Sequence, residues 1–326
     1  MVKTAIEETR LSNIDVIRCF AILSLVAWHS LCVYVGWRGY LPDITAAVEG
    51  SVLVKWYCIF TTKIIMPDAN MPLFVIIAAY VYSCLWKKGK YRDSLVFFQK
   101  KAKRLVVPYF VIGTIVIYTI ADWHPISILW GDAHHLWFCA MLFWCFVFIR
   151  VCQKLPPPFG ALLVICGLFL QIHPVSVDVL GFLKGLKYFP YFVFGYYLYI
   201  YLPKIKEYRW HRLMVISIWL LAVMLYFSVK RSEFICYAYC FMIFDLIPEN
   251  PTVPTWIKKI SMYSFGIYVF HEWFLWNVAH IEQIHPFIIE HQILYPLIMF
   301  VSVLCISILL TKYSLKTKLG RFLLGG

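Results

Sequence analysis

The stretch LYPLIMFVSVLCISILL, residues 294–310, decides the fold class because it is apolar throughout and carries no charged side chain. A transmembrane α-helix needs about 20 predominantly apolar residues, whereas a membrane β-strand shows about 10 residues of alternating polarity. This stretch and a second one, FVIGTIVIYTIA at residues 110–121, are continuous rather than alternating. Both therefore indicate membrane-spanning helices.

The composition of the whole chain agrees with this interpretation. Of the 326 residues, 62% are hydrophobic and only 14% are charged, against roughly 25% charged residues in an ordinary soluble domain. The 11 cysteines lie almost entirely in apolar runs, without a Cys-x-x-Cys pair or a Cys/His spacing typical of metal sites, so we expect no bound metal. The net charge of +13 comes from short loops between apolar runs, so it indicates membrane topology rather than a nucleic-acid partner.

Ten apolar segments have the length expected of a membrane span. They are residues 14–36, 69–86, 104–121, 135–152, 158–172, 186–202, 211–229, 233–248, 262–280 and 292–311. A further apolar stretch, residues 51–66, contains two lysines and is predicted to be interfacial or re-entrant. The sequence thus predicts an all-α polytopic membrane protein with about ten transmembrane helices. We expect a single membrane domain over residues 1–326, with its helical core at about 12–311 and no appended soluble domain.

Lysine and arginine are distributed unevenly between the two sets of loops. With the N-terminus inside, the cytoplasmic segments hold 23 of the 30 Lys and Arg residues and the opposite loops hold seven. An excess of positive residues marks the cytoplasmic loops of membrane proteins. Both termini are therefore predicted to be cytoplasmic, and we expect a multi-pass protein of the cytoplasmic (inner) membrane.

The first predicted span contains three ionisable residues, Asp15, Arg18 and His29. An ionisable group at mid-helix costs roughly 2.5–3.5 kcal/mol, so each calls for a physical reason. His29 returns to nearly the same helical face as Arg18, about 16 Å further along the axis, and Asp15 lies one turn before Arg18. This polar seam indicates a functional site. The structural alternatives are snorkelling of Arg18 to the membrane surface and a hydrogen-bonded core histidine.

A second polar seam lies in the ninth span. It consists of Ser261, Ser264, Tyr268 and His271, at spacings of three, four and three residues. Glu272 lies one position off this face. Serine and tyrosine often hydrogen-bond between membrane helices, so helix packing is the alternative to function. A second histidine within a span favours function.

Residues 87–104 form the most basic loop, with eight Lys and Arg in 18 residues. Membrane topology predicts positive charge there. A polyanion such as a nucleotide phosphate, or an anionic lipid headgroup, is a second candidate partner.

Several motifs occur in the order typical of the membrane-bound acyltransferase 3 family, which the chain resembles over roughly residues 12–311. The motifs are Asn13-Ile14-Asp15-x-x-Arg18 with His29 after ten intervening residues, Met71-Pro72-Leu73-Phe74 through Tyr80, Lys101-Ala102-Lys103-Arg104 leading into Pro108-Tyr109, His135-Leu136-Trp137-Phe138, Tyr191 through Gly195, and Ser264 through Tyr268 to His271. The chain departs from the family pattern at Ala78-Ala79, where members usually have Ser-Gly. Members of this family transfer acyl groups, often acetyl, onto sugar hydroxyls of cell-surface glycans.

The resemblance implies an O-acyltransferase, with acetyl as the expected acyl group. It implies acyl-CoA as a co-substrate that enters from the cytoplasm, no tightly bound cofactor, and a sugar or lipid-linked glycan as acceptor in contact with membrane lipids. The expected catalytic residues are His29, Asp15, Arg18 and His271. The expected donor-binding residues are Arg18, Lys101 and Arg104. The expected substrate-binding residues are His135, Trp137, Tyr268 and Ser264.

His29 has two possible roles in such a reaction. As a neutral imidazole it takes the proton of the acceptor hydroxyl as a general base, or it carries the acyl group briefly itself. Two other functions use the same residues. One is a transporter or flippase for a lipid-linked sugar, with the histidine seams as a proton relay, and the other is a ligand-sensing membrane domain without catalysis.

Overall fold

The computed structural model describes residues 11–35, 41–60, 69–119, 124–131, 133–173, 178–229 and 233–324. Every regular element within these ranges is a helix, which confirms the all-α prediction. The helices are α2 (Ser12–His29), α3 (Cys32–Val35), α4 (Pro42–Val48), α5 (Val52–Ile59), α6 (Asn70–Lys87), α7 (Ser94–Lys101), the π-helix η3 (Ala102–Val106), α8 (Val107–Thr119), η4 (Pro125–Ile128), η5 (His134–Leu136), α9 (Trp137–Cys152), α10 (Pro157–Ile172), α11 (Phe182–Lys206), α12 (His211–Val229), α13 (Glu233–Leu246), α14 (Thr255–Ala279), η6 (Glu282–Ile284), α15 (His285–Glu290), α16 (Leu294–Ser314) and α17 (Lys318–Leu324).

Where the structure describes them, the ten predicted spans fall on helices or runs of helices. Five helical segments in the described ranges are long and apolar enough to cross a membrane. They are Ser12–Tyr34, Asn70–Lys87, Ser94–Thr119, His134–Cys152 and Leu294–Ser314. The count of ten transmembrane helices and the cytoplasmic location of the termini stay predictions. The start of the stretch 51–66 forms the short helix α5, and its residues 61–66 lie outside the described part of the chain.

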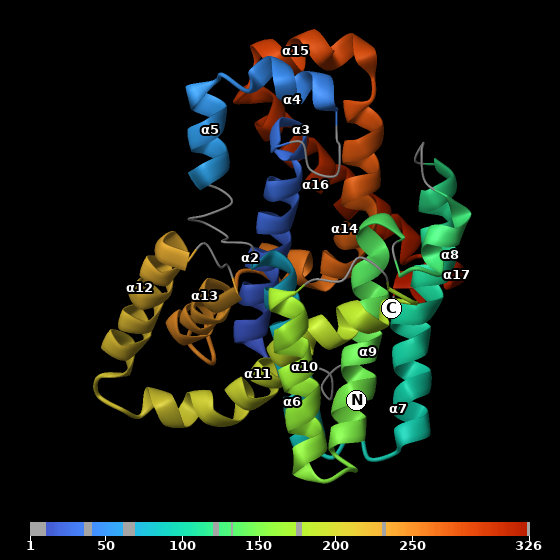
Figure 1. The fold of residues 1–326 in the computed structure, drawn as a ribbon. Helices are drawn as coiled ribbons and strands as arrows, with labels where there is room; N and C mark the ends of the chain where they lie inside the picture. The colour runs from blue at the N-terminus through green and yellow to red at the C-terminus, as the bar shows by residue number, and fades with distance from the viewer. Residues whose placement is uncertain are drawn as a thin grey trace.

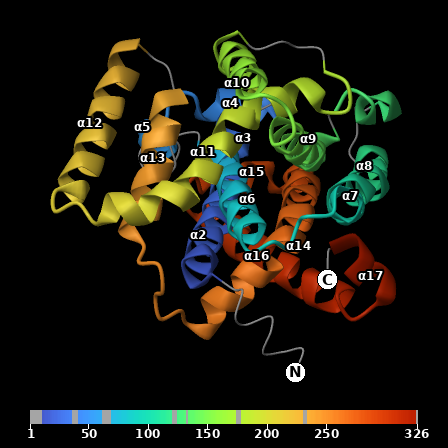
Figure 2. The same ribbon diagram turned by 90° about the horizontal axis from the view of Figure 1, so that it is seen from below.

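The middle of the molecule is built by two groups of tightly packed helices. Helix α6 packs along α11, and α14 packs against both α2 and α16 (Figure 1). The view from below in Figure 2 places α12 at one edge of the molecule and α7 and α8 at the opposite edge. The close approach of α6 and α11 requires glycine at position 195, because an added Cβ there would lie 2.5 Å from the backbone oxygen of Ile76.

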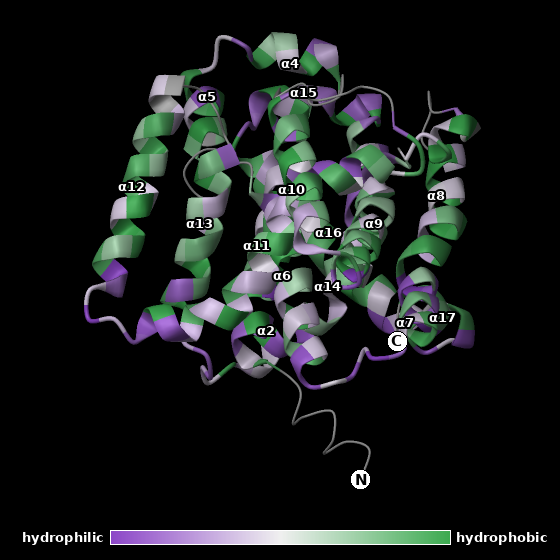
Figure 3. Cartoon of the chain, turned by 60° about the horizontal axis from the view of Figure 1, so that its bottom comes forward, coloured by the Kyte–Doolittle hydropathy of each residue, from purple (hydrophilic) through white to green (hydrophobic). Residues whose placement is uncertain are grey.

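The outer helices expose apolar side chains. On α12 the exposed large apolar residues include Leu213, Met214, Leu220, Leu221 and Met224. Figure 3 shows hydrophobic residues along the length of α12 and hydrophilic residues at the turn below it. In water such a surface would be an aggregation liability, whereas lipid chains solvate it. The exposed apolar surface therefore agrees with a membrane environment.

The short helices gather at the two ends of the long ones. Helices α7 and α17 lie at one end of the molecule, and α4 and α15 lie at the other (Figure 3). Helix α2 runs between these ends, with Ser12 at its start and His29 as its last residue. The predicted catalytic histidine therefore lies toward the end that carries α4 and α15.

Candidate active site

His29 and His271 meet at the interface of α2 and α14. The Nδ1 atom of His29 lies 2.8 Å from the Nε2 atom of His271, a hydrogen-bonding distance. His271 is fully buried and His29 is 9% exposed. The structure thus brings together two predicted catalytic residues that are 242 positions apart in the sequence.

The hydrogen bonds of this pair define where its protons lie. The Nδ1 atom of His271 is 2.8 Å from the backbone oxygen of Tyr268. A carbonyl oxygen only accepts, so Nδ1 of His271 carries a hydrogen and Nε2 of the neutral ring is an acceptor. His29 must then donate from its Nδ1 atom, which leaves the lone pair of its neutral ring on Nε2. One backbone carbonyl therefore orients two imidazole rings in sequence.

A second buried cluster lies beside this pair and contains His134, His135 and Glu272. The Nδ1 atom of His134 is 3.2 Å from Oε1 of Glu272, and the Nδ1 atom of His135 is 3.4 Å from Oε2. The Nε2 atom of His135 donates to the backbone oxygen of Val269 at 3.0 Å. The hydroxyl of Tyr268 donates to the backbone oxygen of His135. The histidines of η5 are thus attached to α14 by both main-chain and side-chain contacts.

Two members of this cluster, His134 and Glu272, were not among the predicted site residues. Glu272 follows His271 and is rotated about 100° from it around the helix, and its carboxylate reaches the histidines of η5 while it stays within 4.8 Å of the ligand atoms of His29 and His271. The sequence contained a signal for this cluster, because Glu272 is an acidic residue inside a predicted span and His134 and His135 are consecutive histidines at the start of another. His134 also has a positive φ of 50°, a conformation that residues other than glycine rarely adopt.

The other end of the α2–α14 interface contains the remaining seam residues. The Ser261 hydroxyl donates to Oδ1 of Asp15 at 2.7 Å, and both side chains are buried. Ser264 is buried one turn further along α14, and Arg18 is half-buried on α2. The structure therefore gives Asp15 a serine partner on α14, and its predicted pairing with Arg18 stays a prediction.

A family profile described as an acyltransferase domain matches residues 11–312. The chain belongs to the acyltransferase 3 family. Searches of curated proteins and of solved structures gave no significant match. Family membership confirms the resemblance drawn from the motifs, and together with the five apolar helices it supports a multi-pass membrane acyltransferase.

The predicted donor-binding residues of the acyltransferase differ in their surroundings. Lys101 ends α7 and is half-buried, with its Nζ atom 3.8 Å from the centre of the Phe146 ring. Arg104 is exposed within the π-helix η3, a helix type that often marks functional sites. Arg104 is therefore the better placed of the two to meet a soluble anion. The predicted substrate residue Trp137 begins α9 and contacts the Tyr188 ring at 5.6 Å.

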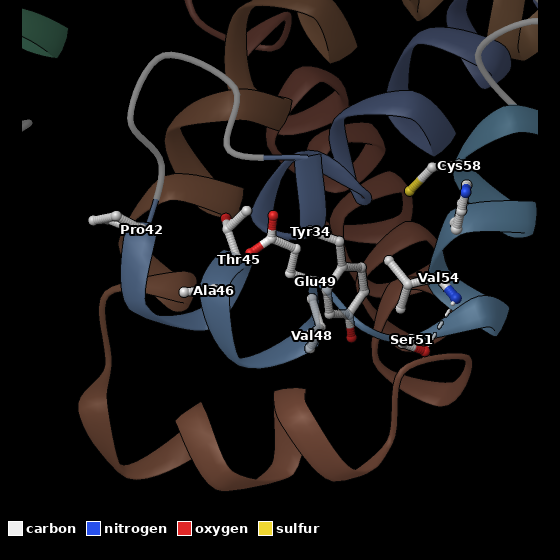
Figure 4. Close-up of a pocket in the computed structure, with 10 residues that line it drawn as sticks. Tyr34, Pro42, Thr45, Ala46, Val48, Glu49, Ser51, Val54 and Cys58 are labelled. Carbon is white, nitrogen blue, oxygen red and sulfur yellow. Dashed lines mark hydrogen bonds between the residues drawn. The ribbon is translucent and has the colours of Figure 1, made fainter.

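The acyltransferase has a cavity of about 450 Å³ among α3, α4 and α5, at the end of α2 that carries His29 (Figure 4). It is lined by Tyr34, Pro42, Thr45, Ala46, Val48, Glu49, Ser51, Val54, Lys55 and Cys58. Tyr34 is five residues beyond His29 in the sequence. Most of the lining is apolar, and hydroxyl, carboxylate and ammonium groups share it, which is a composition typical of small-molecule sites.

Proposed function

We propose that the chain is an integral membrane O-acyltransferase that moves an acyl group, with acetyl as the first candidate, from cytoplasmic acyl-CoA to a sugar hydroxyl of a cell-surface glycan or lipid-linked precursor. The observation that carries the proposal is the buried His29–His271 pair, whose hydrogen bonds leave the lone pair of His29 on Nε2. A neutral imidazole positioned in this way is a suitable proton acceptor for a hydroxyl group.

The reaction balances with His29 as the only proton carrier. Its Nε2 atom accepts the proton of the acceptor hydroxyl while the hydroxyl oxygen attacks the thioester carbonyl carbon. The carbon–sulfur bond then breaks, and the imidazolium returns the proton to the CoA thiolate, which gives an ester and free CoA. In the alternative route Nε2 attacks the thioester carbon, the carbon–sulfur bond breaks and CoA leaves as the thiolate, which gives an acyl-imidazolium. The acceptor hydroxyl then attacks the acyl carbon, the bond to Nε2 breaks, and the hydroxyl proton passes to the CoA thiolate. Both routes need the lone pair on the same nitrogen atom.

Charge and cavity composition support the two substrates. The phosphates of CoA require positive partners, and the basic segment of residues 87–104, which the structure folds largely into α7 and η3, ends in the exposed Arg104. The cavity near the end of α2 combines a mostly apolar lining with a few polar groups, among them Thr45, Glu49 and Ser51, as in sites for small organic ligands, and an acceptor sugar is one such ligand. Donor and acceptor would then approach His29 from opposite ends of the molecule.

The test uses the purified full chain in nanodiscs with acetyl-CoA, and follows free thiol release together with donor binding. Wild-type protein is expected to bind acetyl-CoA and to release thiol slowly. His29→Ala should bind the donor but lose about 100-fold or more of the release rate, as expected when a general base is removed. His173→Ala, which changes an exposed histidine at the end of α10, is the matched control and should behave as wild type.

Two results would contradict the proposal. Wild-type rates in a folded His29→Ala protein would remove His29 from the chemistry. Failure of the folded wild-type protein to bind acetyl-CoA or longer acyl-CoAs would remove the donor assignment. A single-turnover reaction without acceptor, followed by mass spectrometry of the protein, distinguishes the two routes, because only the second leaves an acyl group on His29.

A further inference from the structure

The cluster of His134, His135 and Glu272 is not needed for the transfer reaction described above, although it lies next to the His29–His271 pair. We propose that these three residues form a binding site for a divalent transition-metal ion, with Zn²⁺ as the representative ion. The site is inferred from the geometry of its ligand atoms, and it does not depend on the identity of the acyl donor or acceptor.

The distances between the ligand atoms match those of a metal site. Zinc bonds to nitrogen and oxygen at about 2.0–2.1 Å in tetrahedral geometry, which separates neighbouring ligand atoms by about 3.3 Å. The Nδ1 atoms of His134 and His135 are 3.4 Å apart, and each lies 3.2 or 3.4 Å from an oxygen of Glu272. The His29–His271 contact at 2.8 Å is shorter and has the length of a direct hydrogen bond. The ligand atoms of His29, His271 and Glu272 also lie within 4.8 Å of one another, but the contact between the two rings has the length of a hydrogen bond, so the cluster of His134, His135 and Glu272 is the better match to a metal site.

Hydrogen bonding at His135 directs its lone pair into the cluster. Because Nε2 of His135 faces the backbone oxygen of Val269, it carries a hydrogen, and the lone pair of the neutral ring lies on Nδ1. This lone pair points toward the carboxylate of Glu272 and the ring of His134. Electron-rich atoms at these distances repel each other unless a proton or a metal ion lies among them. A histidine that ligates a metal commonly donates its other N–H to a backbone carbonyl, which is the arrangement of His135.

Burial and backbone conformation give independent support. All three side chains are nearly inaccessible, with exposed fractions of 1% for His134, 3% for His135 and 2% for Glu272. The left-handed backbone of His134, at a φ of 50°, is a strained conformation of the kind found at functional sites and ligand clamps. The ring of His134 is further held in a T-shaped contact with Trp276 at 5.4 Å.

The chemistry of the ligand set indicates the class of metal. Two imidazoles and one carboxylate are typical ligands of zinc and of non-haem iron, whereas magnesium and calcium prefer oxygen ligands alone. The sequence did not reveal this set, because its ligands come from η5 and α14 and lack the short spacing of a metal-binding motif.

The alternative occupant of the cluster is a proton, in which case the cluster would be a buried imidazolium–carboxylate pair. Metal analysis of the full chain distinguishes a metal ion from a proton. The chain is purified in detergent with an affinity tag that contains no histidine. The protein is treated with a chelator, incubated with a small excess of Zn²⁺, desalted and analysed for zinc by mass spectrometry. Incubation with Co²⁺ in parallel tests the coordination by visible absorption.

Three variants accompany the wild type. Glu272→Gln and His134→Ala each remove one ligand. Asp245→Asn is the matched control, because Asp245 is also a buried carboxylate beside a histidine, with its Oδ1 atom 3.7 Å from Nε2 of His211. We expect about one zinc ion per chain in wild type and in the control, and a loss of bound zinc in both ligand variants. Zinc should also raise the melting temperature of the wild type but not that of Glu272→Gln.

Two outcomes would overturn the proposal. Wild-type protein that retains no zinc, and gives no cobalt spectrum, would identify the cluster as an imidazolium–carboxylate pair. Equal zinc in wild type and in folded Glu272→Gln would show that the metal binds elsewhere. Because the wild type alone decides the first outcome, the test does not depend on the folding of any variant.

Discussion

The hydrogen bond between His29 and His271 predicts that position 271 needs an acceptor at one particular atom. A glutamine side chain can place its Oε1 atom near the position of the His271 Nε2 atom, which is 2.8 Å from Nδ1 of His29. An asparagine side chain is one bond shorter and reaches only as far as the Nδ1 atom, which contacts the backbone oxygen of Tyr268. His271→Gln should therefore keep His29 in its working tautomer, and His271→Asn should not.

The size of the effect follows from the lost hydrogen bond. In His271→Asn the buried N–H of His29 loses this acceptor, at a cost of about 1–3 kcal/mol. Each 1.36 kcal/mol corresponds to a factor of ten in rate, so kcat should fall about 5- to 150-fold. Because His271 acts through His29 and not on the donor, the KM for acetyl-CoA should change little. His271→Gln should retain most of the wild-type kcat.

The assay is thiol release from acetyl-CoA by purified variants in nanodiscs, with thermal unfolding measured in parallel to identify loss of fold. His280→Asn is a matched control. His280 lies at the end of α14, and its Nδ1 atom is 2.7 Å from the backbone oxygen of Trp276, but its side chain is exposed. Its kcat should equal that of wild type. Equal kcat values for folded His271→Asn and His271→Gln would refute the role assigned to the Nε2 acceptor.

Two further predictions concern helix packing and the donor. Gly195→Ala should destabilise the protein by about 1–3 kcal/mol, because its Cβ would lie 2.5 Å from a backbone oxygen of α6. In contrast, the added Cβ of Gly160→Ala would lie 3.5 Å from the Cys152 side chain, so this variant should be neutral or stabilising by up to about 1 kcal/mol. Denaturant titration of both variants in detergent measures their free energies of unfolding. Equal stability of the two would contradict the packing argument. Arg104→Glu should raise the KM for acetyl-CoA with little change in kcat, whereas reversal of the exposed Lys154 should not; an unchanged KM in both would assign Arg104 to membrane topology alone.

The sequence by itself determined the fold class and the residues of two polar seams. Continuous apolar runs such as residues 294–310 admit only helices across a membrane, since the backbone must satisfy its own hydrogen bonds there. Helical periodicity then placed Arg18 with His29 on one face, and Ser261 with His271 on another. The order of the motifs led to the acyltransferase 3 family, which the family comparison confirmed.

Only the tertiary structure decided which helix faces contact each other. Periodicity states that two residues share a face, but not which helix that face contacts, and between membrane helices the contact depends on packing and interhelical hydrogen bonds. The fold therefore decided that His271 binds His29, and that Glu272, one position further and about 100° around α14, also meets the histidines of η5. The proposed proton carrier and the proposed metal site are thus neighbours, joined by two consecutive residues of α14.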